Sequence, residues 1–128
     1  MSDLRALIES GLVDKEDGTI FDTTTNLFWQ KESSNKVFIW MRAKMYCESL
    51  TLAGYNDWRL PTREELEYLI NRKYCPTIDP IFECKSDIYC SSSTDENFPN
   101  VIGCINFSDG FVAYGYKKEA IFVRAVRG

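Results

Sequence analysis

A short run in the middle of the chain fixes its local structure more tightly than any other part of the sequence. Trp58-Arg59-Leu60-Pro61 is followed directly by Thr62-Arg63-Glu64-Glu65. A proline holds the residue before it in an extended conformation, and Thr-x-x-Glu is the capping box that begins a helix. We therefore predict an extended connector that ends at Pro61 and a helix that begins at Thr62.

Helical periodicity continues after the capping box and recurs in two other segments. Apolar residues at three- and four-residue steps predict a helix over Trp40–Leu52. The first thirteen residues predict another short helix, within an N-terminal helical extension over residues 1–16. The predicted buried positions of these helices are Leu4, Leu7, Ile8, Trp40, Ala43, Cys47, Leu50, Leu66, Leu69 and Ile70.

The rest of the chain is rich in β-prone runs separated by turns. Asn26 precedes the second of these runs, and we expect it at positive φ. Residues 71–100 contain three of the four prolines and predict a long loop region. Strands are predicted over Thr19–Asp22, Leu27–Gln30, Ile88–Ser93, Val101–Phe107, Phe111–Tyr116 and Ile121–Arg127. The 128 residues therefore predict one α+β domain over residues 1–128, with two helices packed on a twisted antiparallel sheet.

Charge and composition exclude several classes of function. The chain has 19 acidic and 15 basic residues, a net charge of −4, which argues against a nucleic acid or a sulfated polyanion as ligand. It has no histidine, which excludes Ser-His-Asp and Cys-His catalysis and every histidine-dependent zinc site. Met1–Val13 lacks the apolar core of a leader, and no stretch is long and apolar enough to insert into a membrane. The compartment stays open.

The five cysteines permit several interpretations. They are Cys47, Cys75, Cys84, Cys90 and Cys104. An odd number does not form a complete disulfide framework. Thiols packed as small apolar side chains, a disulfide that closes the loop between residues 75 and 90, and a reactive or metal-binding thiol all remain open.

Six motifs in chain order resemble the DUF1566 family, also called the C-terminal domain of Legionella collagen-like proteins. The motifs are G-T-I-x-D-x-x-T-x-L-x-W (Gly18 to Trp29), W-x-x-A-x-x-Y-C (Trp40 to Cys47), G-Y-x-D-W-R-L-P-T-x-x-E-L (Gly54 to Leu66), Y-x-S-S (Tyr89 to Ser92), F-S-x-G (Phe107 to Gly110) and V-R-x-V-R (Val123 to Arg127). The resemblance implies a C-type-lectin-like fold, in the branch shared with formylglycine-generating enzymes and with variable proteins of diversity-generating retroelements. Members of this family are mostly ligand-binding or surface-displayed modules, and many are exported.

The resemblance also implies structural roles for the signature residues. Trp58 would fill the core between the helices and the sheet. Arg59 and either Arg124 or Arg127 would pair with buried acids such as Asp57 or Glu65. The full set is Trp29, Trp40, Asp57, Trp58, Arg59, Thr62, Glu65, Arg124 and Arg127.

The candidate binding surface lies in the loop over residues 85–100 and the turns over residues 108–119. Tyrosine and serine are typical of adaptable recognition loops, and Tyr114 and Tyr116 share one face of a strand by its two-residue period. The candidate ligand-binding residues are Tyr89, Ser91, Ser92, Ser93, Asp109, Tyr114 and Tyr116.

We expect a non-enzymatic recognition module that binds a protein or a glycan. Two alternatives stay open: a displayed receptor-binding domain of the retroelement or phage type, and an enzyme on a formylglycine-generating-enzyme-like scaffold. No cofactor and no resident metal are predicted, although incidental calcium binding by Asp95, Glu96 and Asp109 stays open. The expected partners include no nucleic acid and no membrane; a homo-oligomer is compatible with the sequence, and would be a trimer in a displayed protein.

Overall fold

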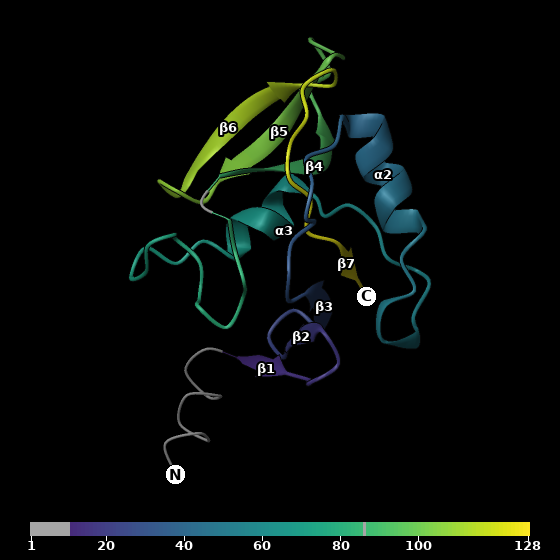
Figure 1. The fold of residues 1–128 in the computed structure, drawn as a ribbon. Coiled ribbons are helices and arrows are strands. Elements are labelled where there is room, and N and C mark those ends of the chain that lie inside the picture. The colour runs from purple at the N-terminus through teal and green to yellow at the C-terminus, as the bar shows by residue number, and fades with distance from the viewer. Residues whose placement is uncertain (1–10, 86) are drawn as a thin grey trace.

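Two antiparallel sheets lie above and below a short helix (Figure 1). The computed structural model describes residues 11–85 and 87–128. In these residues the strands are β1 (Leu12–Asp14), β2 (Thr19–Asp22), β3 (Leu27–Gln30), β4 (Ile88–Thr94), β5 (Val101–Asn106), β6 (Phe111–Tyr116) and β7 (Val126–Arg127). The helices are α2 (Trp40–Glu48) and α3 (Arg63–Tyr68), with a short 3-10 turn, η1 (Leu52–Gly54). The predicted α+β class is therefore correct.

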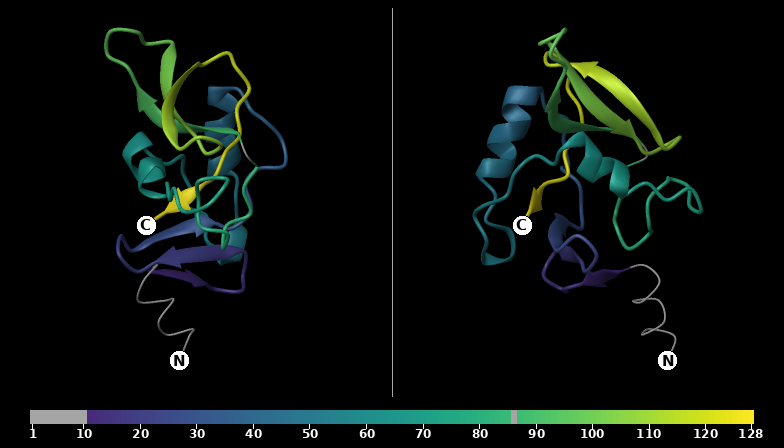
Figure 2. Two further views of the ribbon diagram at one scale, coloured as in Figure 1. Left: turned by 90° about the vertical axis from the view of Figure 1, so that its left-hand side faces the viewer. Right: turned by 180° about the vertical axis from the view of Figure 1, so that it is seen from behind.

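The strands form two sheets, where the sequence predicted one. The larger sheet has the order β1-β2-β3-β7, and the smaller one has the order β4-β5-β6. Helix α3 lies between the two sheets and α2 runs along one side, as the views of Figure 2 also show. The predicted strands on each side of Asn26 pair antiparallel as β2 and β3, as do β5 and β6, and Asn26 has the predicted positive φ, at 61°.

Two predicted boundaries are wrong near the N-terminus and after α2. The part of the predicted N-terminal helix that falls on residues 1–10 lies outside the described residues, but Leu12–Asp14 is strand β1, because it pairs with β2. Helix α2 ends at Glu48, four residues before the predicted end at Leu52. Beyond it, Ala53 and Gly54 have φ of 57° and 82°, a left-handed conformation that a right-handed helix cannot continue.

The predicted last strand over residues 121–127 is also shorter, because this segment crosses from one sheet to the other. Ile121 forms an isolated bridge with Phe38, and Phe122 forms a parallel bridge with Tyr89 of β4. Only Val126–Arg127 joins a sheet, beside β3. The segment therefore ties the smaller sheet to the larger one.

Trp58 fills the core as the family resemblance implied. Its side chain is buried among residues of α2, β4 and β5, including Ala43, Cys47 and Cys104. Its indole Nε1 donates to the carbonyl of Leu52 at 3.2 Å. A second cluster around Trp29, which is also buried, packs α3 against the larger sheet. The connector before α3 therefore contributes Trp58 to one core cluster, and α3 packs in the other, around Trp29.

Candidate functional site

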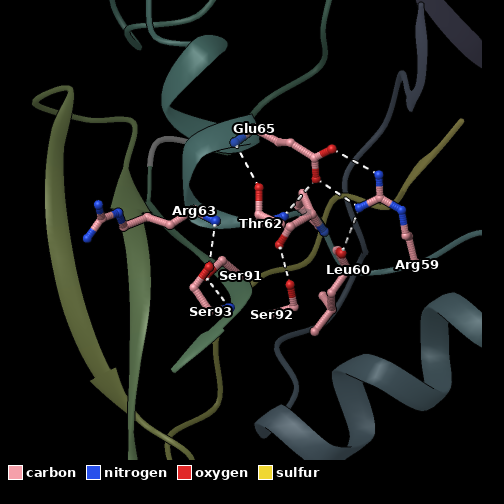
Figure 3. A network of polar contacts seen from close by, with 9 residues as sticks. Arg59, Leu60, Thr62, Arg63, Glu65, Ser91, Ser92 and Ser93 are labelled. Carbon is pink, nitrogen blue, oxygen red and sulfur yellow. Dashed lines mark hydrogen bonds and ion pairs between the residues drawn. The ribbon is translucent and has the colours of Figure 1, made fainter. Parts of the chain in front are cut away.

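The start of α3 is held by a network of charge-assisted hydrogen bonds (Figure 3). The Thr62 hydroxyl accepts from the Glu65 backbone N–H at 3.1 Å, and the Glu65 carboxylate accepts from the Thr62 N–H at 2.8 Å. This is the predicted capping box. The same carboxylate accepts hydrogen bonds from both terminal nitrogens of Arg59, at 2.8 and 2.9 Å. These bonds lower the pKa of Glu65. The predicted Arg59–Glu65 pair is therefore present, in bidentate geometry.

The second expected arginine pair is formed by Arg127, and Arg124 has a different environment. Arg127 donates to both oxygens of Asp57, at 2.6 and 3.1 Å, although Asp57 is exposed and not buried as expected. Arg124 is fully buried, and its guanidinium donates to the backbone carbonyls of Gln30, Lys31 and Glu83 at 2.6 to 2.7 Å. Arg124 therefore joins three chain segments through backbone carbonyls, and no carboxylate of residues 11–85 or 87–128 pairs with it.

The serines of β4 join this strand to β5, to the connector and to the start of α3, so their hydroxyls already have hydrogen-bond partners. The Ser91 hydroxyl donates to the Gly103 carbonyl at 2.7 Å, and the Ser92 N–H donates to the Pro61 carbonyl at 2.8 Å. The Ser93 hydroxyl accepts from the Arg63 N–H at 3.0 Å. Figure 3 shows the three serines below the start of α3.

Two of the candidate ligand-binding residues do not lie on the exposed surface that the sequence predicted for them. Tyr89 and Ser91 are completely buried, because the strand predicted over residues 88–93 packs into the fold as β4 and does not form part of an exposed binding surface. The ring of Tyr89 packs edge-on against Phe107. Ser92 and Ser93 are only half-buried, but their hydroxyls serve the network described above.

Tyr114 and Tyr116 do form an exposed surface, together with an arginine that the sequence analysis missed. Their side chains are 65% and 61% exposed. Tyr114 pairs with Gly103 of β5, and the methylene stem of Arg63 lies over Gly103, with Cδ only 3.1 Å from where a Cβ would stand. Figure 3 shows the Arg63 side chain leaving the network and crossing β5. We call Arg63, Tyr114 and Tyr116 the tyrosine–arginine face.

The position of Arg63 follows from two sequence signals. The capping box places this residue in the first turn of α3, and a glycine in the central strand leaves space for its stem. Among the residues that the structure describes, the guanidinium has ion pairs at 3.6 Å to Glu64 and to Glu67, and its Nε has no hydrogen-bond partner. The face therefore presents two phenol rings beside a guanidinium that pairs with two acids at 3.6 Å.

Asp109, the remaining candidate, lies in the turn between β5 and β6. Its side chain is exposed, and Oδ1 accepts from the Phe111 backbone N–H at 2.9 Å. Asp95 likewise accepts from the N–H groups of Asn97 and Phe98. Residues 11–85 and 87–128 contain no group of three or more acidic or cysteine side chains that could hold a metal ion.

A cleft of about 520 Å³ lies on another part of the surface. One wall is the stacked pair of Phe38 and Tyr46, with ring centroids 5.1 Å apart. The Gln30 side chain is already occupied, because it donates to the Tyr46 hydroxyl and accepts from the Ala125 N–H. The other lining residues are Gly18, Lys31, Glu32, Ser33, Asn35, Lys36 and Leu52.

All five cysteines are free thiols, so the open alternative of a disulfide across residues 75–90 is wrong for this structure. Cys47, Cys90 and Cys104, the core thiols, are buried, and Cys75 is exposed. Burial raises the pKa of Cys47 and of Cys104 to about 12, and it raises the pKa of Cys90 as well. The core thiols are therefore uncharged and poor nucleophiles at neutral pH.

The two helices and two antiparallel sheets define an α+β domain, in which the connector, the capped helix α3 and strand β4 are joined by hydrogen bonds. A family model, the Lcl C-terminal domain, matches residues 18–127, and the chain belongs to this family, as its motifs indicated. No curated protein matches the chain. Within the described residues, none of the helices has the length and apolar character that crossing a membrane would need.

Proposed function

We propose that this domain is a non-enzymatic recognition module that binds a protein or a glycan through the tyrosine–arginine face. The observation that carries the proposal is the exposure of Tyr114 and Tyr116 on one side of a strand whose other side is packed at Ala113 and Gly115. Tyrosine and arginine dominate the binding energy of many interfaces. Both phenol rings stand on a regular strand and lose little side-chain freedom when a partner covers them.

The chemistry of the face suits a neutral or acidic partner group. A phenol ring offers an apolar surface for the C–H face of a sugar ring or for an apolar side chain, with a hydroxyl beside it. Arg63 adds planar donors that match a carboxylate or a carbonyl. Its stem is fixed over Gly103, so the guanidinium is positioned before a partner arrives.

The absence of an enzymatic activity is part of this proposal. It is supported by the burial and raised pKa of the core thiols, which are unsuited to nucleophilic or copper-thiolate chemistry. We also propose the C-type-lectin-like arrangement for this fold. Membership of the Lcl C-terminal domain family and the presence of two antiparallel sheets with two helices support that assignment.

The test is a binding screen followed by substitution of the face. The full chain is screened against an array of neutral and acidic glycans and against a displayed peptide library, and each binder is measured again with Tyr114→Ala and Tyr116→Ala. We expect at least a tenfold loss of affinity, because a buried tyrosine at an interface contributes on the order of 2 kcal/mol.

Phe111→Ala is the matched control, because Phe111 is also 61% exposed on β6 but lies on the other side of the strand. The affinity of the Phe111→Ala variant for each binder should equal that of the wild type. Binding that survives both tyrosine substitutions, or that falls equally in the control, would place the site elsewhere. A second pair of variants, Phe38→Ala and Asn35→Ala, then tests the 520 Å³ cleft.

A further inference from the structure

Strand β6 leaves part of its backbone unpaired at the edge of the smaller sheet. The Lys117 N–H donates to the Asn100 carbonyl, one residue beyond the pair of Val101 and Tyr116. Hydrogen bonding alternates along an antiparallel pair. The backbone groups of alternate β6 residues, including Ala113, therefore face β5, and those of Val112, Tyr114 and Tyr116 point to the free edge.

One end of this edge is covered and the other is not. The Tyr116 N–H donates to the Glu119 carboxylate at 2.9 Å, and its carbonyl accepts from the Glu119 N–H at 2.9 Å. No hydrogen bond from outside the sheet reaches the backbone of Val112 or Tyr114 within residues 11–85 and 87–128. Natural proteins usually protect such an edge with a proline, a bulge or a charge, because it invites another strand to pair.

We propose that two copies of this chain pair through β6, antiparallel about a two-fold axis, to form one continuous six-stranded sheet. The register of this pair follows from which β6 backbone groups are free to form hydrogen bonds. Val112 of each copy lies opposite Tyr114 of the other, and the two Ala113 residues lie opposite each other at the two-fold axis. Their small side chains suit the close approach of a pair that exchanges no hydrogen bonds.

Charge at the two ends of β6 favours a second copy in this register. Asp109 precedes the strand, and Lys117 and Lys118 follow it. In the proposed register Asp109 of each copy faces Lys117 of the other, so both ends carry an opposite-charge pair. A register shifted to put Tyr114 opposite Tyr114 would place Asp109 against Glu119 and would need the backbone groups that Glu119 already occupies.

The remaining neighbours in this register are also compatible. Phe111, which is largely exposed, would lie beside Gly115 of the second copy, where no side chain obstructs it. The two-fold axis stands perpendicular to the sheet, so the tyrosine–arginine faces of both copies lie on the same side. The dimer does not depend on the proposed function, but it would present that surface twice to a repetitive ligand.

The direct test is the mass of the full chain in solution, measured by sedimentation velocity from about 10 µM to about 1 mM, since a contact of one strand pair is small and weak. We expect a concentration-dependent dimer. Val112→Pro removes one N–H from the free edge, a place where strands tolerate proline, and should raise the dissociation constant at least tenfold. Val112→Thr keeps the N–H and should dimerise like the wild type.

A second measurement does not depend on any variant. Amide hydrogen exchange of the wild type should slow at Val112 and Tyr114 as the protein concentration rises, while other exposed amides should not change. A monomer at every concentration, a trimer, or equal association by Val112→Pro and the wild type would overturn the proposal. None of these results would affect the loss of ligand affinity expected for Tyr114→Ala.

Discussion

The structural role of Glu65 can be tested through the protein's stability and its dependence on pH. Its carboxylate caps α3 and binds Arg59 with two hydrogen bonds. Replacement by alanine removes both interactions, and replacement by glutamine keeps a capping group but removes the charge. A lost cap costs about 1 kcal/mol, and a half-exposed bidentate pair contributes about 1 kcal/mol after solvent screening. We expect the free energy of unfolding to fall by about 2 kcal/mol in Glu65→Ala and about 1 kcal/mol in Glu65→Gln.

The same argument fixes the direction of the pH effect. The pKa of Glu65 is lowered in the folded protein, mainly by its hydrogen bonds with Arg59. A carboxyl group with a lowered folded pKa stabilises the protein fully above its unfolded pKa, about 4.3, and loses that contribution as the pH falls through the folded value. The difference between the wild type and Glu65→Gln should therefore be largest near neutral pH and should shrink on acidification below about 4.

Urea unfolding followed by tryptophan fluorescence, from neutral pH into the acid range, measures both effects. Glu64→Gln is the matched control, because that side chain is 70% exposed and lies 3.6 Å from its nearest cation. It should change the free energy of unfolding by less than about 0.5 kcal/mol. A Glu65→Gln variant as stable as the wild type at neutral pH, or a deficit that stays constant in acid, would refute the proposed role of this carboxylate.

Three further predictions concern the buried parts of the fold. Gly115→Ala should cost about 1–3 kcal/mol of unfolding free energy in the same urea assay, because its Cβ would meet Ile121 Cδ1 at 2.8 Å; unchanged stability would show that this side chain yields. Arg124→Lys should cost about 3 kcal/mol or more, because an ammonium cannot reproduce the guanidinium's bonds to three carbonyls; a loss below about 1 kcal/mol would contradict this role. In a thiol titration of the native protein Cys75 should react rapidly and the core thiols only after unfolding, and rapid labelling of the core thiols in Cys75→Ser would contradict their burial.

Local chemistry made the connector and the hairpins predictable. Proline, the capping box and alternating strand residues act over a few residues, so Thr62, Glu65 and the strands on each side of Asn26 lie where the sequence indicated. The family resemblance extended this prediction to Trp58 and to the Arg59–Glu65 pair. The serine motif was recognised from the same resemblance but was assigned to a ligand, because its contacts with Pro61 and Gly103 are formed only in the tertiary structure.

The failures have a common physical origin in long-range pairing. The segment before Asp14 has helical spacing, yet pairing with β2 makes residues 12–14 a strand. Division of the strands into two sheets depends on the crossing of residues 121–127, which has the composition of a single strand. The burial of Tyr89 follows from the same crossing, since Phe122 pairs with it and packs on its ring. No local pattern contains that information.

Under the proposed function, stability and recognition would meet at one residue, Arg63. The backbone N–H of Arg63 belongs to the network that joins α3 to β4, its stem covers Gly103, and its guanidinium lies on the exposed face. The two tyrosines contribute little to the core, so a partner surface can change around them without loss of the fold. Arg63 has no such freedom, because its position is set by the same capping box that begins the helix. If the face binds a partner as proposed, its specificity can vary through the tyrosines, while Arg63 stays fixed by the fold itself.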